Sequence, residues 1–226
     1  MVNDMEKTSF RPGNMLYPAP AVLVSCSDGE GHANMLTLAW AGTVCSDPPM
    51  LSVSIRKERF SHHMIMKTGE FVVNLTTEEL VRAADFSGVR SGKDTDKWKE
   101  TGLTMGKAFK VNAPVIAESP VNIECRVKKV LELGSHDMFI AEVVAVGVDK
   151  RLLDEKGRLR LEDCGLIAYV HGAYQALGKK LGTFGFSVKK ERAKEKDKRA
   201  AAGRKKTAGQ APKKKTNAKA DGKKKQ

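Results

Sequence analysis

Short β-type segments separated by turn residues recur along most of this chain, and they limit the folds open to it. Each segment is a run of apolar, often β-branched residues. Few helical stretches lie between them and no strand–helix–strand rhythm appears, which argues against a doubly wound parallel sheet. We therefore expect a mainly β fold with a few helices, built as an antiparallel barrel. The predicted strands are 21–27, 34–44, 50–56, 70–75, 121–133, 137–149 and 165–170.

Two connections have the composition of hairpin turns. The link 27–33 is rich in Gly and Asp, so the first two predicted strands should pair as a hairpin. Gly134, Ser135 and His136 join the two longest runs and predict a second hairpin. Asp47-Pro48-Pro49 should end the second strand before the third begins.

Helical signals are confined to two stretches. Residues 61–69 predict a helix with Ser61 as its N-cap and Gly69 just past its end. Thr77 is expected to cap a second helix over 78–87, which has two glutamates in its first turn. Residues 87–98 are then expected to form a polar loop.

The charge of the chain is unevenly distributed. The chain has 226 residues and a formal net charge of +13. Residues 187–226 hold 17 Lys and Arg against 4 Asp and Glu, which accounts for the whole excess. These residues are almost free of apolar side chains, so we expect a disordered basic tail after a folded domain of residues 1–186. Such a tail can bind polyanions weakly and without sequence preference, because it has no aromatic residues for base stacking.

Several classes of protein and site do not fit the sequence. No apolar run is long enough for a secretory signal or a membrane span, so we expect a cytoplasmic protein with no membrane contact. The four cysteines lie in apolar, strand-like contexts, form no CxxC pair, and are expected to be reduced core residues. They are Cys26, Cys45, Cys125 and Cys164. No metal site is predicted, since His62 and His63 are adjacent on a helix and cannot share a face.

The common nucleotide motifs are also missing. No GxGxxG follows a strand, which excludes a Rossmann cradle. The loop from Gly88 to Asp94 imitates a P-loop, but it is one residue short between its glycines. Asp94 also stands where Ser or Thr would hold magnesium. The loop is either a solvated connection or a donor-rich segment that can close over an anion.

A group of polar residues around 52–62 suits a phosphate. Ser52 and Ser54 alternate with apolar neighbours, so their hydroxyls share one face of a strand, and Arg56 continues that face. Ser61 and His62 follow at a helix N-terminus, where free N–H groups favour an anion. The same alternation is also typical of a solvent-facing strand, and the residues alone leave both interpretations open.

Several ordered motifs resemble those of the flavin reductase-like FMN-binding split barrel family, close to the flavoredoxins. The early ones are Asn34-x-x-Thr37-x-x-Trp40, Asp47-Pro48-Pro49, Ser52-Val53-Ser54-Ile55-Arg56 and Glu70-Phe-Val-Val-Asn74. The later ones are the run Ser87–Trp98, Gly134-Ser135-His136-Asp137 and Tyr174-x-x-Leu177-Gly178 with its continuation to Gly185. The match covers roughly residues 15–186 and implies a Greek-key split β-barrel that binds FMN.

The resemblance also implies roles for particular residues. The segment Asn34-Met35-Leu36-Thr37 should line the flavin ring, and Trp40 is either core or part of that wall. His136 is the implied catalytic residue at the open face of the ring, bordered by Lys97 and Trp98. The phosphate would be held by Ser52, Ser54, Arg56, Ser61 and His62. Val53 is also counted in the cofactor site, which is completed by Asn74, Ser87, Gly88 and Lys93.

The implied function is an FMN-dependent oxidoreductase, either an NADH- or NADPH-dependent flavin reductase or a flavoredoxin-like electron carrier that serves a redox protein. The flavin supplies hydride chemistry, so no acid–base pair is needed. The resemblance implies a homodimer. One departure is Ala141, where many relatives have Gly; a methyl group facing the flavin would narrow the nicotinamide slot. The alternative is a nucleic-acid-associated protein in which the barrel is a scaffold for the basic tail.

Overall fold

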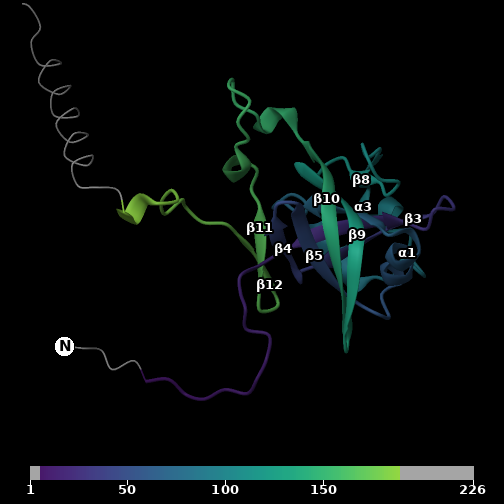
Figure 1. Ribbon diagram of the computed structural model, residues 1–226, viewed down its shortest axis with the longest axis horizontal. Coiled ribbons are helices and arrows are strands. Elements are labelled where there is room, and N and C mark those ends of the chain that lie inside the picture. The colour runs from purple at the N-terminus through teal and green to yellow at the C-terminus, as the bar shows by residue number, and fades with distance from the viewer. Residues whose placement is uncertain (1–5, 189–226) are drawn as a thin grey trace, which may run out of the picture. The chain divides into compact units, whose positions relative to one another are not determined.

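The structure is a computed structural model that describes residues 6–188 (Figure 1). Its contacts divide the chain into a compact unit that ends at Gly178 and a second unit from Lys179 onward. The described part of the second unit contains one 3-10 turn, η3 (Phe186–Val188). The predicted domain end near Phe186 stays a prediction, and the expected disordered tail beyond Val188 lies outside the described residues.

A seven-stranded antiparallel sheet dominates the compact unit, which confirms the mainly β prediction. Its strand order is β3-β2-β6-β9-β10-β5-β4. Figure 1 shows β9 and β10 as its long hairpin. The strands are β2 (Val22–Ser27), β3 (Ala33–Leu38), β4 (Ala41–Ser46), β5 (Pro49–Arg56), β6 (Glu70–Leu75), β9 (Val121–Leu133) and β10 (His136–Val148).

Shorter elements surround this sheet. One small sheet has the order β1-β11-β12 and another pairs β7 with β8. Their bounds are β1 (Ala19–Pro20), β7 (Met105–Gly106), β8 (Val115–Ile116), β11 (Ile167–Val170) and β12 (Ala173–Ala176). The helices are α1 (Phe60–Thr68), α2 (Val81–Val89) and α3 (Lys97–Thr101), with 3-10 turns η1 (Lys150–Leu152) and η2 (Leu161–Asp163).

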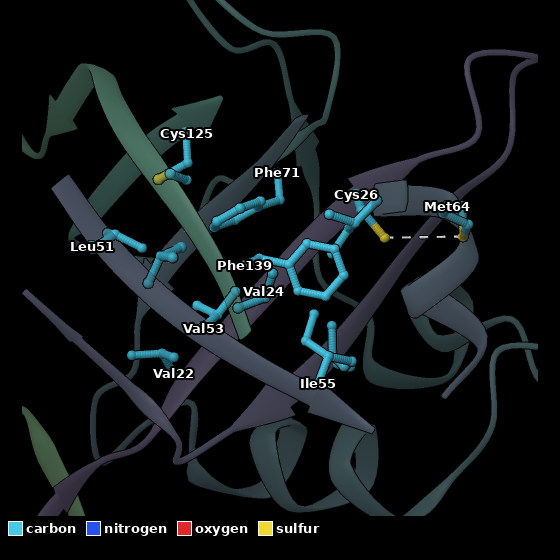
Figure 2. Close-up of a cluster of buried hydrophobic side chains, with 14 residues drawn as sticks. Val22, Val24, Cys26, Leu51, Val53, Ile55, Met64, Phe71, Cys125 and Phe139 are labelled. Carbon is cyan, nitrogen blue, oxygen red and sulfur yellow. Dashed lines mark hydrogen bonds between the residues drawn. The ribbon is translucent and has the colours of Figure 1, made fainter. Parts of the chain in front are cut away.

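The main hydrophobic core shows how the sheet curls. Val22 and Val24 of β2 share one buried cluster with Val53 and Ile55 of β5, although three strands separate β2 from β5 in the sheet. Figure 2 shows these side chains meeting around the ring of Phe139. Opposite regions of one sheet can share a core only if the sheet bends around it. The result is a barrel-like sheet in which β3 and β4 remain separate edges.

Both predicted hairpins are confirmed, but the predicted single strand over 34–44 is wrong. The chain forms β3 against β2 and then β4 against β5, at opposite edges of the sheet. The change of direction falls at Ala39 and Trp40, where the Trp40 carbonyl accepts a hydrogen bond of 2.8 Å from the Ser54 N–H.

The predicted helix starts also need correction. Helix α1 begins at Phe60 with Arg59 as its N-cap, and no side chain caps it. Ser61 instead lies inside the first turn and accepts a hydrogen bond from Asn34. Helix α2 begins at Val81 rather than after Thr77, because Thr77 forms a β-bridge with Leu166.

The remaining boundaries are mixed. Gly69 ends α1 as predicted, with a φ of 67° that favours glycine. The expected polar loop over 87–98 is shorter than predicted, because its first residues finish α2 and its last two begin α3.

Candidate functional site

Two neighbouring cavities lie where β3, β5, α1 and α2 meet. The larger has a volume of about 530 Å³ and the smaller about 260 Å³, and both are lined by Arg59 and Val89. The larger volume falls in the range of roughly 300–1,000 Å³ typical of small-molecule and cofactor sites. Because the two share lining residues, they are adjacent.

The β3–β4 turn forms one wall of the larger cavity. Residues 37–40 line it there, and the turn frees backbone groups that a continuous strand would use for pairing. Helix α2 packs closely against this wall, since the Thr37 hydroxyl donates a hydrogen bond to the Ala84 carbonyl. A Cβ at Gly88 would lie 3.3 Å from Thr37 Cβ, so glycine permits this approach. The wall offers backbone donors and acceptors to the edge of a planar ring.

Aromatic side chains form a second wall. Trp40, Tyr169 and Tyr174 line the larger cavity. Tyr17 lies behind them, with its ring centroid 6.3 Å from Trp40 and 6.2 Å from Tyr169. Burial, and next the charge of Asp85, raise the pKa of Tyr174 above its ordinary value of 10. The rings make this wall largely apolar, and the carboxylate of Asp85 lines the same cavity.

The smaller cavity is built around a buried lysine. Lys97 is 3% exposed, and its ammonium donates hydrogen bonds to the Met35 carbonyl at 2.7 Å and the Ser87 carbonyl at 2.8 Å. Burial lowers the pKa of Lys97 from its ordinary 10.5 to about 8, and the charge of Arg59 adds to this effect. Within residues 6–188 no carboxylate forms an ion pair with Lys97, so its charge lacks a counter-ion in the protein.

Other donors face the same cavity. Asn34 Nδ2 donates a 2.8 Å hydrogen bond to Ser61 Oγ, and both side chains are buried. Gly92 makes this arrangement possible, since a Cβ there would lie 2.4 Å from Asn34 Oδ1. Ser61 and Arg59 stand at the start of α1, where backbone N–H groups and the helix dipole favour a negative charge. Glu58 also lines this cavity, but its carboxylate pairs with Arg56, and Arg59, Arg90 and Lys97 outnumber it. The lining is therefore net positive, which suits an anion.

The structure brings together only some of the residues predicted from the sequence. Those that line the larger cavity are Thr37, Ser54, Arg56, Gly88 and His136, and those that line the smaller one are Asn34, Leu36, Ser61 and Lys97. The others line neither cavity, and they are Met35, Ser52, Val53, His62, Asn74, Ser87, Lys93 and Trp98. The residues predicted to bind one phosphate are therefore divided, because Arg56 lines the larger cavity and Ser61 lines the smaller one.

Interior packing accounts for most residues of the second group. Met35 and Val53 are fully buried in the hydrophobic clusters. Trp98 is 6% exposed, and its Nε1 donates to the Ala33 carbonyl at 3.3 Å. Asn74 is also fully buried; it donates to the Leu23 carbonyl at 3.0 Å and accepts from the Ile116 N–H at 3.0 Å. The hydrogen-bonding groups of Asn74 are used by the protein itself.

His62 has a protein partner rather than an open nitrogen at an anion site. Its Nε2 lies 2.8 Å from Asp137 Oδ2, and both side chains are nearly buried. Burial alone would raise the pKa of Asp137, but its hydrogen bonds with His62 and Lys57 lower it overall. The pair joins the start of α1 to the start of β10, so it fixes Ser61 and His136 relative to each other.

Three remaining predicted residues differ in burial. Ser52 is 9% exposed and Ser87 is fully buried. The Ser87 carbonyl holds Lys97. Lys93 is exposed on the loop before α3. Ala141 is fully buried in the core cluster, so its methyl group does not reach the cavity.

Sequence reasoning missed several lining residues. Arg59 lines both cavities and donates to the Gly88 carbonyl at 2.9 Å. Its place two residues before Ser61, at a helix start, was a usable signal for an anion site. Asp85, Val89 and Tyr169 gave no local signal, because only tertiary contacts bring them to the cavity.

Two kinds of feature are absent from residues 6–188. No group of three or more metal-binding side chains is present in this part of the chain. No helix in it is long and apolar enough to cross a membrane.

Comparisons with known proteins point in one direction. The flavin reductase like domain model matches residues 14–178. The flavoredoxin of Desulfovibrio vulgaris (Miyazaki F) has 31% identity and a TM-score of 0.76, over 81% of this chain and 100% of that chain. The FMN-binding protein from Thermus thermophilus has 26% identity and a TM-score of 0.65, over 80% and 99%. An NADH-dependent flavin reductase of Pseudomonas fluorescens is 27% identical, over 64% of this chain and 80% of its own length. The structural likeness confirms the expected split barrel.

Proposed function

This chain belongs to the flavin reductase-like domain family, and from that premise we propose that it is an oxidoreductase that binds FMN across the two cavities. The flavin ring would lie in the larger cavity and the phosphate in the smaller. When bound, FMN would supply the chemistry by accepting a hydride from a donor and passing electrons to an acceptor. The protein's own contribution is to hold, orient and shield the cofactor.

The observation that carries this proposal is the buried ammonium of Lys97. Two carbonyls solvate it, but they do not neutralise its charge. Burying an uncompensated charge is costly, so such a group is expected to have a counter-ion when the protein is at work. A phosphate monoester in the smaller cavity would contact Lys97, Arg59 and Ser61 together, and the placement of these residues in one lining supports the proposal.

The larger cavity fits the ring end of the same ligand. The backbone of residues 37–40 would pair with the polar edge of the ring, and the aromatic wall would cover its apolar part. A ribityl chain between the two cavities would run past Arg59, which lines both. His136 borders the same cavity, and we keep it as the residue expected beside the approaching electron donor.

The donor and the assembly complete the proposal. We propose NADH or NADPH as the donor, with support from the named activity of the Pseudomonas fluorescens relative; a flavoredoxin-like exchange with a redox protein is the other route. We also propose a cytoplasmic homodimer. Strand β4 supports an assembly because it is an uncharged edge strand with Gly42, Thr43 and Val44 exposed. Light scattering of the purified protein would report its mass.

The test of FMN binding compares two flavins that differ only in the phosphate. Wild-type protein should bind FMN at least about tenfold more tightly than riboflavin, given charge-assisted bonds to the phosphate. Lys97→Met should remove most of that difference by weakening FMN alone. Lys93→Met is the control; Lys93 is an exposed lysine on the loop before α3, and this variant should bind like wild type. Equal affinity of the wild-type protein for both flavins, or no binding of either, would refute the proposed site.

A further inference from the structure

Arg56 and His136 form a basic pair at one edge of the larger cavity. They end β5 and begin β10, and the strand register places them directly opposite each other. Directly paired residues in an antiparallel sheet project from the same face with Cβ atoms roughly 4.5–5.5 Å apart. Their neighbours Ile55 and Asp137 face the other side, where Ile55 packs in the core and Asp137 binds His62. Both basic side chains line the larger cavity and neither lines the smaller one.

Both members of this pair are available to a ligand. Arg56 Nε contacts Glu58 Oε1 at 2.6 Å, but the two side chains are 52% and 63% exposed. An ion pair this exposed contributes little stability and can be exchanged for another anion. His136 Nδ1 lies 2.9 Å from the Ser135 hydroxyl. Within residues 6–188 no hydrogen-bond partner is found for its other ring nitrogen, Nε2.

The flavin phosphate does not need this pair. The smaller cavity supplies Lys97, Ser61 and Arg59 for one phosphate; Lys97 and Ser61 are buried, whereas Arg56 is exposed. Charge-assisted bonds are stronger where water is excluded, so the phosphate of the flavin should lie there. Arg56 and His136 are then left for an anion that belongs to a second ligand.

The rest of the lining indicates where the flavin ring lies relative to this pair. Trp40, Tyr169 and Tyr174 also line the larger cavity and form the wall assigned above to the flavin ring. Asp85 lines the same cavity and would repel a phosphate. A donor that reaches the ring in this cavity would therefore place a phosphate at Arg56 and His136 rather than beside Asp85.

We propose that Arg56, assisted by His136, is the subsite for a phosphate group of a nicotinamide dinucleotide donor. The inference rests on the proposed function, because it requires the flavin phosphate to occupy the smaller cavity. It makes Arg56 a determinant of donor affinity rather than of FMN affinity. It also predicts that a donor without phosphate gains nothing from Arg56.

The experiment measures anaerobic reduction of protein-bound FMN by three donors in the stopped-flow spectrophotometer. The donors are NADH, NADPH and N-benzyl dihydronicotinamide, which carries no phosphate. Arg56→Gln should raise the half-saturating concentration of at least one dinucleotide about tenfold or more, and Arg56→Lys should have a smaller effect. Reduction by the benzyl donor and the dissociation constant of FMN should stay within about twofold of wild type.

Arg151→Gln is the matched control. Arg151 also pairs with a carboxylate two residues away, Asp149; its side chain is 89% exposed, and it lines neither cavity. This variant should behave as wild type with all three donors.

Three results would overturn the inference. The first is an Arg56→Gln variant that loses FMN affinity, which would return Arg56 to the flavin phosphate. The second is an equal effect on all three donors, which would make its role structural. The third is bound FMN that neither dinucleotide reduces. Each result leaves FMN binding itself measurable, so failure here is distinct from failure of the proposed function, which would show as no flavin binding by wild-type protein.

Discussion

The buried amine of Lys97 should make FMN binding depend on pH in a way that riboflavin binding does not. Its pKa of about 8, against an ordinary 10.5, reflects about 3 kcal/mol of free energy against the charged form in the folded protein. A phosphate monoester carries nearly two negative charges above about pH 7, and in the smaller cavity it would favour the charged amine. Binding of FMN therefore raises the pKa of Lys97 and takes up a proton above about pH 8.

The magnitude follows from the free protein. With a pKa of about 8, roughly nine-tenths of Lys97 is charged at about pH 7 and roughly one-tenth at about pH 9. If the bound form stays charged over this interval, the dissociation constant of FMN should rise about tenfold between the two pH values. The direction of the change is fixed. The affinity for FMN can only fall as the pH rises through the pKa of Lys97 in the flavin-free protein. Riboflavin has no phosphate and should show no such slope.

Fluorescence titrations of FMN and riboflavin at three pH values would measure this dependence. Lys97→Met should bind FMN more weakly at about pH 7 and show a flat profile, while Lys93→Met should follow wild type. The nearby Cys26 thiol does not confuse the result, because burial raises its pKa to about 11. A tenfold slope that persists in Lys97→Met, or that riboflavin shares, would refute the assignment of Lys97 to the phosphate.

Three further predictions follow from other contacts. Gly92→Ala should weaken FMN about tenfold with little change in melting temperature, because its Cβ would displace the Asn34 amide from Ser61; unchanged affinity would place the phosphate elsewhere. Asn74→Ala should lower the unfolding free energy by about 2–4 kcal/mol in urea titrations, since it leaves buried partners on β2, β8 and β9 unpaired. A loss of FMN affinity without loss of stability would instead return Asn74 to the site. Removal of residues 189–226 should leave FMN affinity unchanged and abolish any salt-dependent binding of polyanions; a truncated protein that no longer binds FMN would assign the tail a part in the site.

The regular parts of this fold could be predicted because their signals are local. Residues 121–133 alternate and end at a glycine turn, and they form β9 with those bounds. Gly69 ends α1 in the left-handed conformation that glycine tolerates. The break at Ala39 and Trp40 could not be predicted, because neither residue is a turn former. The chain turns there only because β4 must reach β5 at the opposite edge of the sheet.

The site was harder to predict for a different physical reason. A polar residue inside an apolar segment shows that it has partners, because a buried polar group without any is costly. The sequence does not say whether those partners are protein or ligand. Asn74 and Asn34 both interrupt apolar strands. Asn74 forms its hydrogen bonds with backbone and side-chain groups of the protein, whereas Asn34 lines a cavity.

The sequence likewise does not show which of two lysines, one before α3 and one within it, is buried. Lys93 and Lys97 are four residues apart in one polar stretch, and the sequence treats them alike. Helix α3 begins at Lys97 and packs against β3, which buries that ammonium beside the Met35 carbonyl. Lys93 stays in the exposed loop. Lys97 is the proposed anion contact because burial removes water from its charge and supplies no carboxylate partner. Both conditions are set by tertiary packing rather than by neighbours in the sequence.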